Sequence, residues 1–169
     1  MNSPVTKSEA TLTGIVETAC RLAAADGIGK LSLGDVAKHM GISKSGVFAR
    51  VGSLIALQHM VLDEYDRSFI ADVLTPSLQM PKGLPRLNAQ LSAWINRASD
   101  PGARTSCLYT AGAFEFDDKP TPLRDRLHDG VTRWRASLRR TIEQAIDAGH
   151  LRPDTDPEQL VFELSSLIV

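Results

Sequence analysis

The sequence predicts an all-α fold, with a three-helix N-terminal head and a larger C-terminal helical body. Apolar residues recur at helical spacing along almost the whole chain, and strand patterns are nearly absent. Prolines and glycines gather where one helical pattern stops and the next begins. With 169 residues, 43% of them apolar, the chain can build a packed core as one domain or two small ones.

The head is expected to contain three helices. Apolar residues repeat at helical spacing over about residues 9–25 and stop at Asp26-Gly27, which predicts the first helix. Ser32 is a good N-cap for a second helix. Gly41 ends that helix, because a residue that tolerates the left-handed conformation is needed there. Ser43 then caps a short third helix.

The body is expected to be helical as well. The predicted helices cover residues 53–74, 84–98, 107–116, 122–149 and the segment from 157 onward. Residues 75–83 contain two prolines and Gly83, and are therefore predicted to form a loop. Thr121-Pro122 and Asp156-Pro157 combine a cap with a first-turn proline, and we expect each pair to open a helix.

Several classes of protein are disfavoured by the sequence. No apolar run has transmembrane length and no signal peptide is seen, so we expect a cytoplasmic protein without membrane association. Cys20 and Cys107 lie far apart without a partner motif, which predicts reduced core thiols. The four histidines share no metal-ligand spacing, and nucleophile-elbow, phosphate-loop and zinc patterns are absent. We therefore expect no enzyme, no metal site and no cofactor.

The net charge of −1 is unevenly distributed. Residues 1–52 contain six Lys/Arg and four Asp/Glu, whereas residues 53–169 contain thirteen and sixteen. A positive N-terminal end fits contact with phosphates, because backbone charge dominates affinity for nucleic acid. The asymmetry is weak and identifies no function by itself.

The most informative segment is residues 31–52. A helix-turn-helix needs a small residue on its first helix, a residue that tolerates positive φ four positions later, and then an apolar plug. Ala37, Gly41 and Ile42 meet these requirements in order. The packing set is completed by Val36, Met40 and Val47. The segment predicts a DNA-binding helix-turn-helix, and a plain helical hairpin is the alternative.

The segment SLGDVAKHMGISKSGVFARVGS resembles the DNA-binding domain of the TetR family of bacterial repressors. CLYTAGAFEFDD, followed later by DPEQLVFEL, resembles a subgroup of that family, so the resemblance covers essentially the whole chain. It implies a DNA-binding domain at 8–52 and a ligand-binding and dimerisation domain at 53–169. The implied function is repression of transcription from a double-stranded DNA operator, relieved when a small molecule enters the body.

The resemblance also implies a set of DNA contacts. Ser45, Gly46 and Phe48 would approach the major groove, and Lys44 would lie near the phosphates. Thr11 and Ser32 match positions that bind phosphates at the starts of the first two helices, with simple capping as an equal alternative. The expected DNA-binding residues are Thr11, Ser32, Ser43, Lys44, Ser45, Gly46, Phe48 and Arg50.

The sequence departs from the family pattern at three places. Val51 stands where an aromatic residue is common, and Leu12 stands where a basic residue is common near Thr11. Leu54-Ile55-Ala56 replaces a lysine followed by acidic residues, and that lysine commonly contacts phosphate. A lower affinity for DNA is implied, with a contribution from Arg50 in place of the missing lysine as the alternative. One alternative is a protein of this fold that has lost DNA binding and acts as a ligand-binding or partner-binding module; another is a small enzyme on a helical scaffold.

A small apolar or aromatic ligand is expected in the body, because bundles of helices tend to enclose such cavities. The candidate lining residues are Met60, Trp94, Cys107, Tyr109, Phe114 and Phe116. Ordinary core packing is the alternative for each of them.

A two-fold homodimer is expected through residues 122–149 and 157–169. An apolar stripe runs along the first of these helices, and the second adds further apolar residues. The interface candidates are Leu127, Val131, Trp134, Leu138, Ile142, Leu160, Leu164 and Leu167. The alternative is a monomer in which both helices are internal core. The last helix of the resembled family usually runs further, so a second alternative is that part of the natural C-terminus is absent from this chain.

Overall fold

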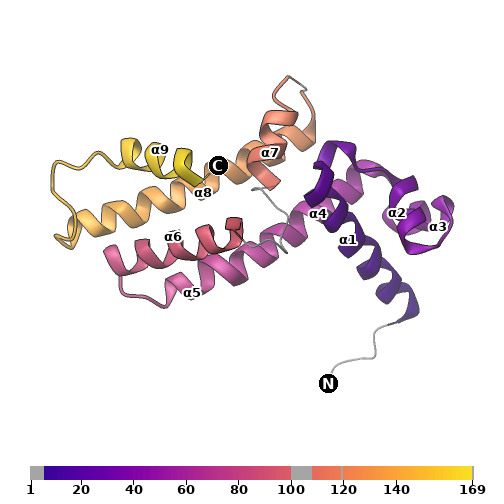
Figure 1. Ribbon diagram of the computed structural model, residues 1–169, viewed down its shortest axis with the longest axis horizontal. Helices are drawn as coiled ribbons and strands as arrows, with labels where there is room; N and C mark the ends of the chain where they lie inside the picture. The colour runs from indigo at the N-terminus through magenta and orange to yellow at the C-terminus, as the bar shows by residue number, and fades with distance from the viewer. Residues whose placement is uncertain (1–5, 100–107, 119, 169) are drawn as a thin grey trace. The chain divides into compact units, whose positions relative to one another are not determined.

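The computed structural model describes residues 6–99, 108–118 and 120–168, and every regular element in these ranges is helical (Figure 1). The all-α prediction is therefore confirmed. The chain divides into two compact units, Met1–Asp66 and Arg67–Val169, which we call the first unit and the second unit.

Side-chain caps explain where the helices of the first unit begin. This unit contains α1 (Lys7–Asp26), the short 3-10 helix η1 (Ile28–Lys30), α2 (Leu33–Met40), α3 (Lys44–Val51) and most of α4 (Leu54–Phe69). Thr6 and Glu9 form a capping box, in which the Glu9 N–H donates to Thr6 Oγ1 (3.2 Å) and the Thr6 N–H donates to Glu9 Oε2 (2.7 Å). The hydroxyl oxygens of Ser32 and Ser43 accept backbone N–H bonds at 3.1 and 3.0 Å, which confirms both predicted N-caps.

The first unit has its own apolar core, to which each of its helices contributes. Its buried side chains include Ile15, Ala19, Ile28, Val36, Val47, Leu57 and Val61. The buried Gln58 side chain donates from Nε2 to the carbonyl of Ile28 at 3.0 Å, which ties α4 to η1 and satisfies a polar group inside the core. The short helices α2 and α3 are thus held on a packed support.

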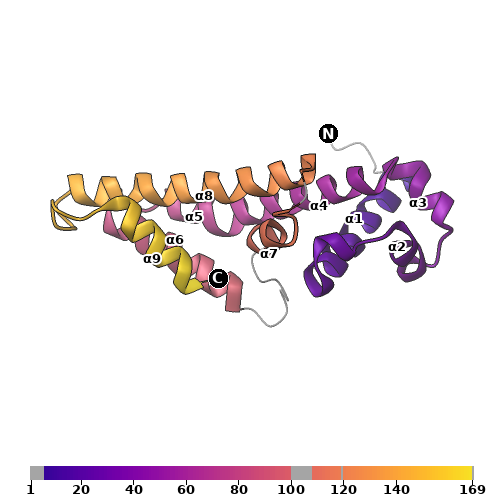
Figure 2. The same cartoon turned by 90° about the horizontal axis from the view of Figure 1, so that it is seen from above.

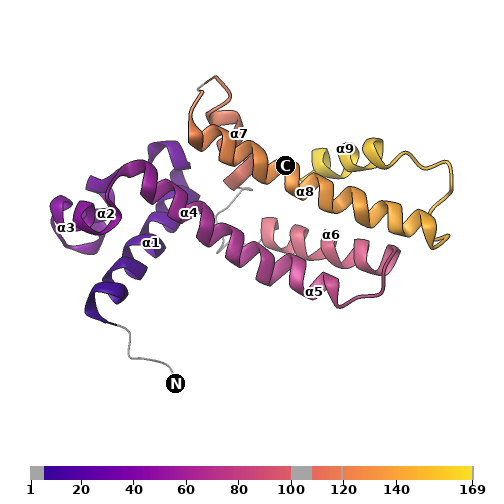
Figure 3. The same ribbon diagram turned by 180° about the vertical axis from the view of Figure 1, so that it is seen from behind.

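The second unit is a helical bundle. It contains η2 (Ile70–Leu74), α5 (Thr75–Leu78), α6 (Leu84–Ser99), α7 (Leu108–Glu115), α8 (Pro122–Asp147) and α9 (Pro157–Ile168). Helices α6 and α8 are antiparallel, because Leu84 N–H donates to Nδ1 of His150, just beyond α8, while Trp94 packs on Trp134. Figures 2 and 3 show α9 turning back alongside α8. Within the described part of the chain no single helix is long and apolar enough to cross a membrane. The helices Lys44–Val51 and Leu54–Leu78 reach that length and apolar character only when they are counted together, and they are bent by 67° at the break between them.

The beginnings of α8 and α9 follow the predicted pattern. Thr121 Oγ1 accepts the backbone N–H of Arg124 at 3.2 Å, and Asp156 Oδ1 accepts two N–H bonds at the start of α9. Both predicted caps are confirmed. The short helix predicted at 107–116 is observed as α7, whereas Cys107 lies outside the described residues.

An aromatic cluster lies in the core of the second unit. The ring of Trp134 meets those of Phe69 and Trp94 edge to face, each with centroids 5.0 Å apart. The Arg97 guanidinium lies 5.9 Å from the Phe69 ring centroid and forms a 2.7 Å ion pair with Asp72. The surrounding buried side chains are Val73, Leu87, Leu138, Ile142 and Val161. Aromatic packing thus joins α6 and α8 to the end of α4.

The predicted loop at 75–83 is partly wrong, because Thr75–Leu78 is helical. The preceding segment, Ile70–Leu74, is a π-helix, and the N–H of Thr75 bonds to the carbonyl of Ile70, five residues earlier. Proline has no backbone N–H, so Pro76 cannot donate the hydrogen bond of a regular α-helical turn. The π-helical turn shifts the hydrogen-bond register immediately before it. The helix therefore continues through the proline and ends only near Gln79.

Tyr109 of α7 packs directly on the backbone of α8 at Gly130. A Cβ atom at position 130 would lie only 2.0 Å from Tyr109 Cε1 and 2.2 Å from Cδ1. The Arg126 guanidinium lies 5.9 Å from the centroid of the same ring, which is buried. The absence of a side chain at Gly130 therefore permits the close approach of α7 and α8.

Candidate nucleic-acid interface

The turn between α2 and α3 has the geometry that the helix-turn-helix pattern predicts. Gly41 adopts φ +66° and ψ 28°, in the left-handed region, and its N–H bonds to the carbonyls of Ala37 and Lys38. The Ile42 N–H reaches the carbonyl of Ala37 at 3.1 Å, which completes a Schellman-type helix end. Ala37 and Val47 are buried, so α3 packs closely on α2. Met40 and Ile42 complete the set as half-buried side chains.

Helix α3 has one buried face and one exposed face. Val47 and Val51 are buried in the first unit. The exposed side chains are Ser43, Lys44, Ser45, Phe48, Ala49 and Arg50, and Gly46 is half-buried. The Phe48 side chain is 54% exposed, which is unusual for a large apolar residue flanked by polar neighbours. The structure thus brings the expected α3 residues together on one surface.

Hydrogen bonds organise both ends of this exposed face. Ser43 Oγ accepts the N–H of Gly46 at 3.0 Å and shares a 3.0 Å hydrogen bond with Ser45 Oγ. At the other end, Arg50 Nη1 donates to the carbonyl of Gly46 at 2.9 Å. The serines are therefore fixed at the N-terminus of α3, and Arg50 lies back along its own helix.

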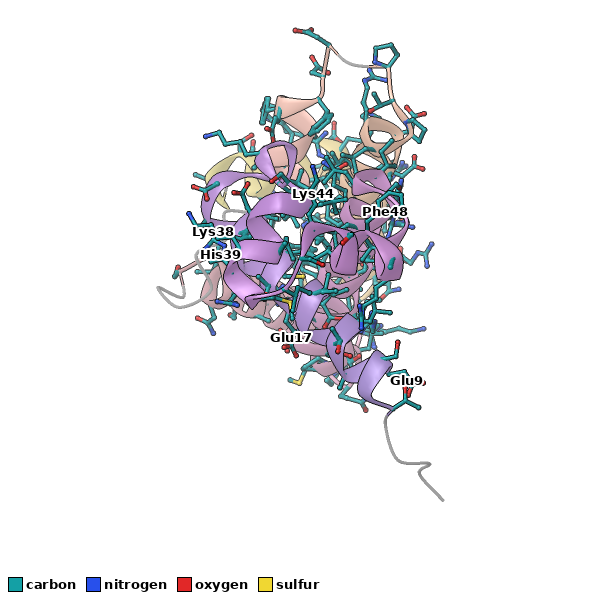
Figure 4. The ribbon with its side chains drawn as sticks, turned by 90° about the vertical axis from the view of Figure 1, so that its right-hand side faces the viewer. Glu9, Glu17, Lys38, His39, Lys44 and Phe48 are labelled. Carbon is teal, nitrogen blue, oxygen red and sulfur yellow. The ribbon has the colours of Figure 1, made fainter. Side chains whose placement is uncertain are left out.

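The neighbouring helix α2 also carries exposed polar side chains. Figure 4 shows Lys38 and His39 on α2 and Lys44 and Phe48 on the neighbouring α3, whereas Glu9 and Glu17 lie along α1. Lys38 and His39 are exposed, and sequence reasoning did not select them. The signal that identifies them is their position opposite the apolar stripe of α2. The positive charge of Lys38 complements a phosphate backbone.

Thr11 and Ser32 occupy different positions in their helices. Ser32 caps α2 and also donates from its hydroxyl to Asp35 Oδ2 at 2.6 Å. Thr11 is half-buried one turn inside α1, because the helix begins earlier and is capped by Thr6. The capping alternative therefore holds for Ser32 and is wrong for Thr11.

The residues that depart from the family pattern also differ in their surroundings. Val51 is 4% exposed and belongs to the core of the first unit. Leu54 and Ala56 are half-buried at the start of α4, and Ile55 is 55% exposed. Ser53 Oγ caps this helix by accepting the N–H of Ala56 at 3.0 Å. Ile55 is therefore the exposed member of the apolar run, and Leu54 and Ala56 are half-buried.

The candidate ligand-binding residues are distributed over both units. Met60 is half-buried on α4 in the first unit, and Phe116 is half-buried just after α7. Trp94 and Tyr109 are buried in the second unit. Phe114 is 79% exposed, so the expectation that it lines a cavity in the body is wrong. Cys107, the sixth candidate, is not among the described residues.

The candidate dimer residues divide into core and surface. Leu127, Leu138 and Ile142 have no exposed surface, because the second unit buries them in its own core, and the expectation that they contact a partner is corrected. The half-buried candidates are Val131, Trp134, Leu160 and Leu164. Leu167 is 82% exposed on α9, as is Phe162 at 58%, which sequence reasoning missed. Arg139 links α8 to α9 through a 2.7 Å ion pair with Glu158.

Known proteins resemble this chain in both sequence and fold. A family model described as "Tetracyclin repressor-like, C-terminal domain" matches residues 83–169, more than half of the chain. No curated protein sequence matches it. A TetR transcriptional regulator from Chloroflexus aurantiacus is 23% identical with a TM-score of 0.80, over 96% of this chain and 82% of that one. A TetR-family transcriptional regulator from Cytophaga hutchinsonii is 22% identical with a TM-score of 0.77, and the match covers 98% of this chain and 83% of that one.

A further similar structure holds two ligands. It is that of AibR in complex with isovaleryl coenzyme A and operator DNA, which is 19% identical with a TM-score of 0.77, over 93% of this chain and 83% of that one. At such low identities these likenesses establish the shared fold alone.

Proposed function

Because the chain belongs to the TetR family of transcriptional regulators, we propose that it binds a double-stranded DNA operator through α2 and α3 and represses transcription until a small molecule binds its C-terminal body. In this proposal residues 8–52 form the DNA-binding domain and residues 53–169 the ligand-binding and dimerisation domain. Regulators of this family are in general transcription factors and not enzymes.

The observation that carries the proposal is the exposed face of α3. Lys44, Ser45 and Phe48 stand in solvent on a helix whose opposite face, Val47 and Val51, is packed into the first unit. A recognition helix needs this combination, because the side chains that enter the major groove must be free while the helix is held rigidly. Lys44 at the N-terminus of α3 suits a phosphate, and the helix N–H groups there favour an anion as well.

Dimerisation is proposed through α8 and α9. Phe162 and Leu167 expose large apolar side chains on α9, which favours a second copy of the same surface as a partner. Two heads related by a two-fold axis would read two half-sites of a pseudo-palindromic operator. These two exposed side chains of α9 support the proposal better than the buried stripe of α8.

Release by a ligand is proposed through the second unit. A ligand shifts the equilibrium only if it binds the state that does not bind DNA more tightly than the state that does. Complete switching, from 99:1 to 1:99, requires a preference of about 10⁴-fold. An apolar or aromatic molecule is the proposed class, because Trp94, Trp134 and Phe69 form an aromatic cluster in this unit. The presence of an acyl coenzyme A in the AibR structure is consistent with a ligand that has an apolar part.

Selection of bound duplexes from a random pool tests the DNA-binding part of the proposal. We expect a symmetric motif whose affinity falls steeply with salt, because phosphate contacts release counterions. A thermal-shift screen then tests release: compounds that stabilise the protein by binding its folded state are expected to weaken operator binding. Recovery of no symmetric motif would contradict the proposal, and so would stabilising compounds that leave DNA affinity unchanged.

A second candidate function is a ligand-binding or partner-binding module without DNA binding. Ile55, an apolar side chain 55% exposed at the start of α4, favours it, because the family pattern places a charged residue in this region. A gel-shift assay with random DNA at low salt separates the two functions. Retardation at low salt supports the regulator, and its absence supports the module.

A further inference from the structure

The exposed face of α3 is poor in groups that can recognise bases by hydrogen bonding. Its four residues in the N-terminal and middle turns are Lys44, Ser45, Phe48 and Ala49. Helix α3 is described in full, and it contains no Asn, Gln, Asp or Glu, the side chains that pair with adenine or cytosine edges. The hydroxyl group of Ser45 is hydrogen-bonded to that of Ser43.

Arg50 is also poorly placed to recognise a base by hydrogen bonding. Arginine reads guanine by a bidentate pair, and it must be directed at the base edge to do so. Here Arg50 lies in the last turn of α3, and its Nη1 donates to the carbonyl of Gly46 at 2.9 Å. Recognition helices contact bases chiefly with their N-terminal residues, so the position of Arg50 suits a phosphate better.

Phe48 is the dominant group on this face. Its ring is 54% exposed, one turn after Lys44, on the surface shown in Figure 4. An apolar side chain can distinguish bases in the major groove in only one way, by contact with the 5-methyl group of thymine. The exposed Ala49 methyl extends the same apolar surface.

We propose that Phe48 is a specificity-determining residue that reads the 5-methyl group of a thymine in each operator half-site. This inference rests on the proposed function, because it requires α3 to enter the major groove. The occupant of this surface is double-stranded DNA, in accordance with the exposed Lys44 and Arg50 on the same helix and Lys38 on the neighbouring α2.

The test replaces thymine by deoxyuridine, which lacks only the methyl group. In a duplex obtained by selection, each thymine is exchanged singly and the affinity is measured with the wild-type chain and with Phe48→Ala. We expect one exchange per half-site to lower wild-type affinity about fourfold, the value for burying one methyl-sized group. Phe48→Ala is expected to bind the thymine and deoxyuridine duplexes equally, and Phe48→Leu to keep part of the difference.

Phe114→Ala is the matched control, because it removes another highly exposed phenyl ring, from α7. It is expected to retain the full sensitivity to deoxyuridine. Thermal melting of each variant checks that it folds, which is expected because both rings are exposed. If wild type binds DNA but no exchange lowers its affinity, or if Phe48→Ala keeps the same sensitivity, the inference is overturned while the proposed function stands. If no duplex is bound at all, both are overturned.

Discussion

Replacing Gly130 by alanine should destabilise the second unit, although alanine favours a helix. The added Cβ would lie 2.0, 2.2 and 2.7 Å from Cε1, Cδ1 and Cζ of Tyr109. Carbon atoms in ordinary contact are about 3.5–4.0 Å apart, so the buried ring would have to move by about 1.5 Å. Overpacking of this kind costs about 1–3 kcal/mol, and glycine to alanine within a helix returns about 1 kcal/mol. The difference between the two terms is an expected fall in the free energy of unfolding of about 1 kcal/mol.

Urea denaturation at one fixed protein concentration measures this change, because the stability of an oligomer depends on concentration. Gly34→Ala is the matched control, since its Cβ would meet only Ser32 Oγ at 3.7 Å, and it should raise stability by up to about 1 kcal/mol. A smaller side chain at the contact, Tyr109→Leu, should reduce the effect of Gly130→Ala. The reasoning is refuted if Gly130→Ala is as stable as wild type, or if its effect is the same in the Tyr109→Leu background.

Three further predictions concern DNA binding, assembly and pH. Lys44→Ala should weaken binding to all DNA sequences and reduce the slope of log affinity against log salt concentration by about one. Lys82→Ala, which removes an exposed lysine of the second unit, should change neither quantity. Fluorescence anisotropy across a salt series measures both, and an unchanged slope for Lys44→Ala would contradict the phosphate contact. Phe162→Ser with Leu167→Ser should shift the mass from dimer to monomer in light scattering, and a mass that is unchanged would contradict the α9 interface. Hydrogen bonds with Thr6 lower the pKa of Glu9 below its ordinary value of 4.5. The ionised carboxylate therefore stabilises α1 fully at pH values above 4.5, and this contribution is lost as the pH falls through the lowered pKa. Glu9→Gln should therefore lose less stability than wild type in acid melts, and an unchanged pH profile would contradict the capping box.

The helix boundaries could be predicted where they depend on neighbours in sequence. Ser32, Gly41 and Thr121 act within one turn of their own backbone, so their roles can be inferred from residue type alone. The end of α4 could not be predicted in this way. Pro76 indicates a break, and the helix continues because the π-helical turn before it supplies a different hydrogen-bond register, which residue type does not reveal.

The candidate DNA surface was also largely predictable, because α3 is short and its buried positions follow from the helical period. The helix-turn-helix motif defines the packing positions of α2 and not its opposite face, so it does not indicate Lys38 and His39. The proposed dimer surface was harder to predict. Periodicity indicates that one face of α8 is covered, but not by what, and Leu138 and Ile142 prove to be covered by their own subunit. The contact of Tyr109 with Gly130 joins segments separated in sequence, and no local pattern indicates it.

The π-helical turn at Ile70–Leu74 makes this part of the chain sensitive to its length. A π-turn closes its hydrogen bond over one residue more than an α-helical turn, so it has the form of a single-residue insertion. Deleting one residue from it would restore the α-helical phase and rotate the following side chains by about 100° around the axis. Ser77, now fully buried with its hydroxyl bonded to the carbonyl of Leu74 at 2.8 Å, would turn away from the core. In this segment the number of residues decides which side chains are inside, so homologues should vary more readily in residue type here than in length.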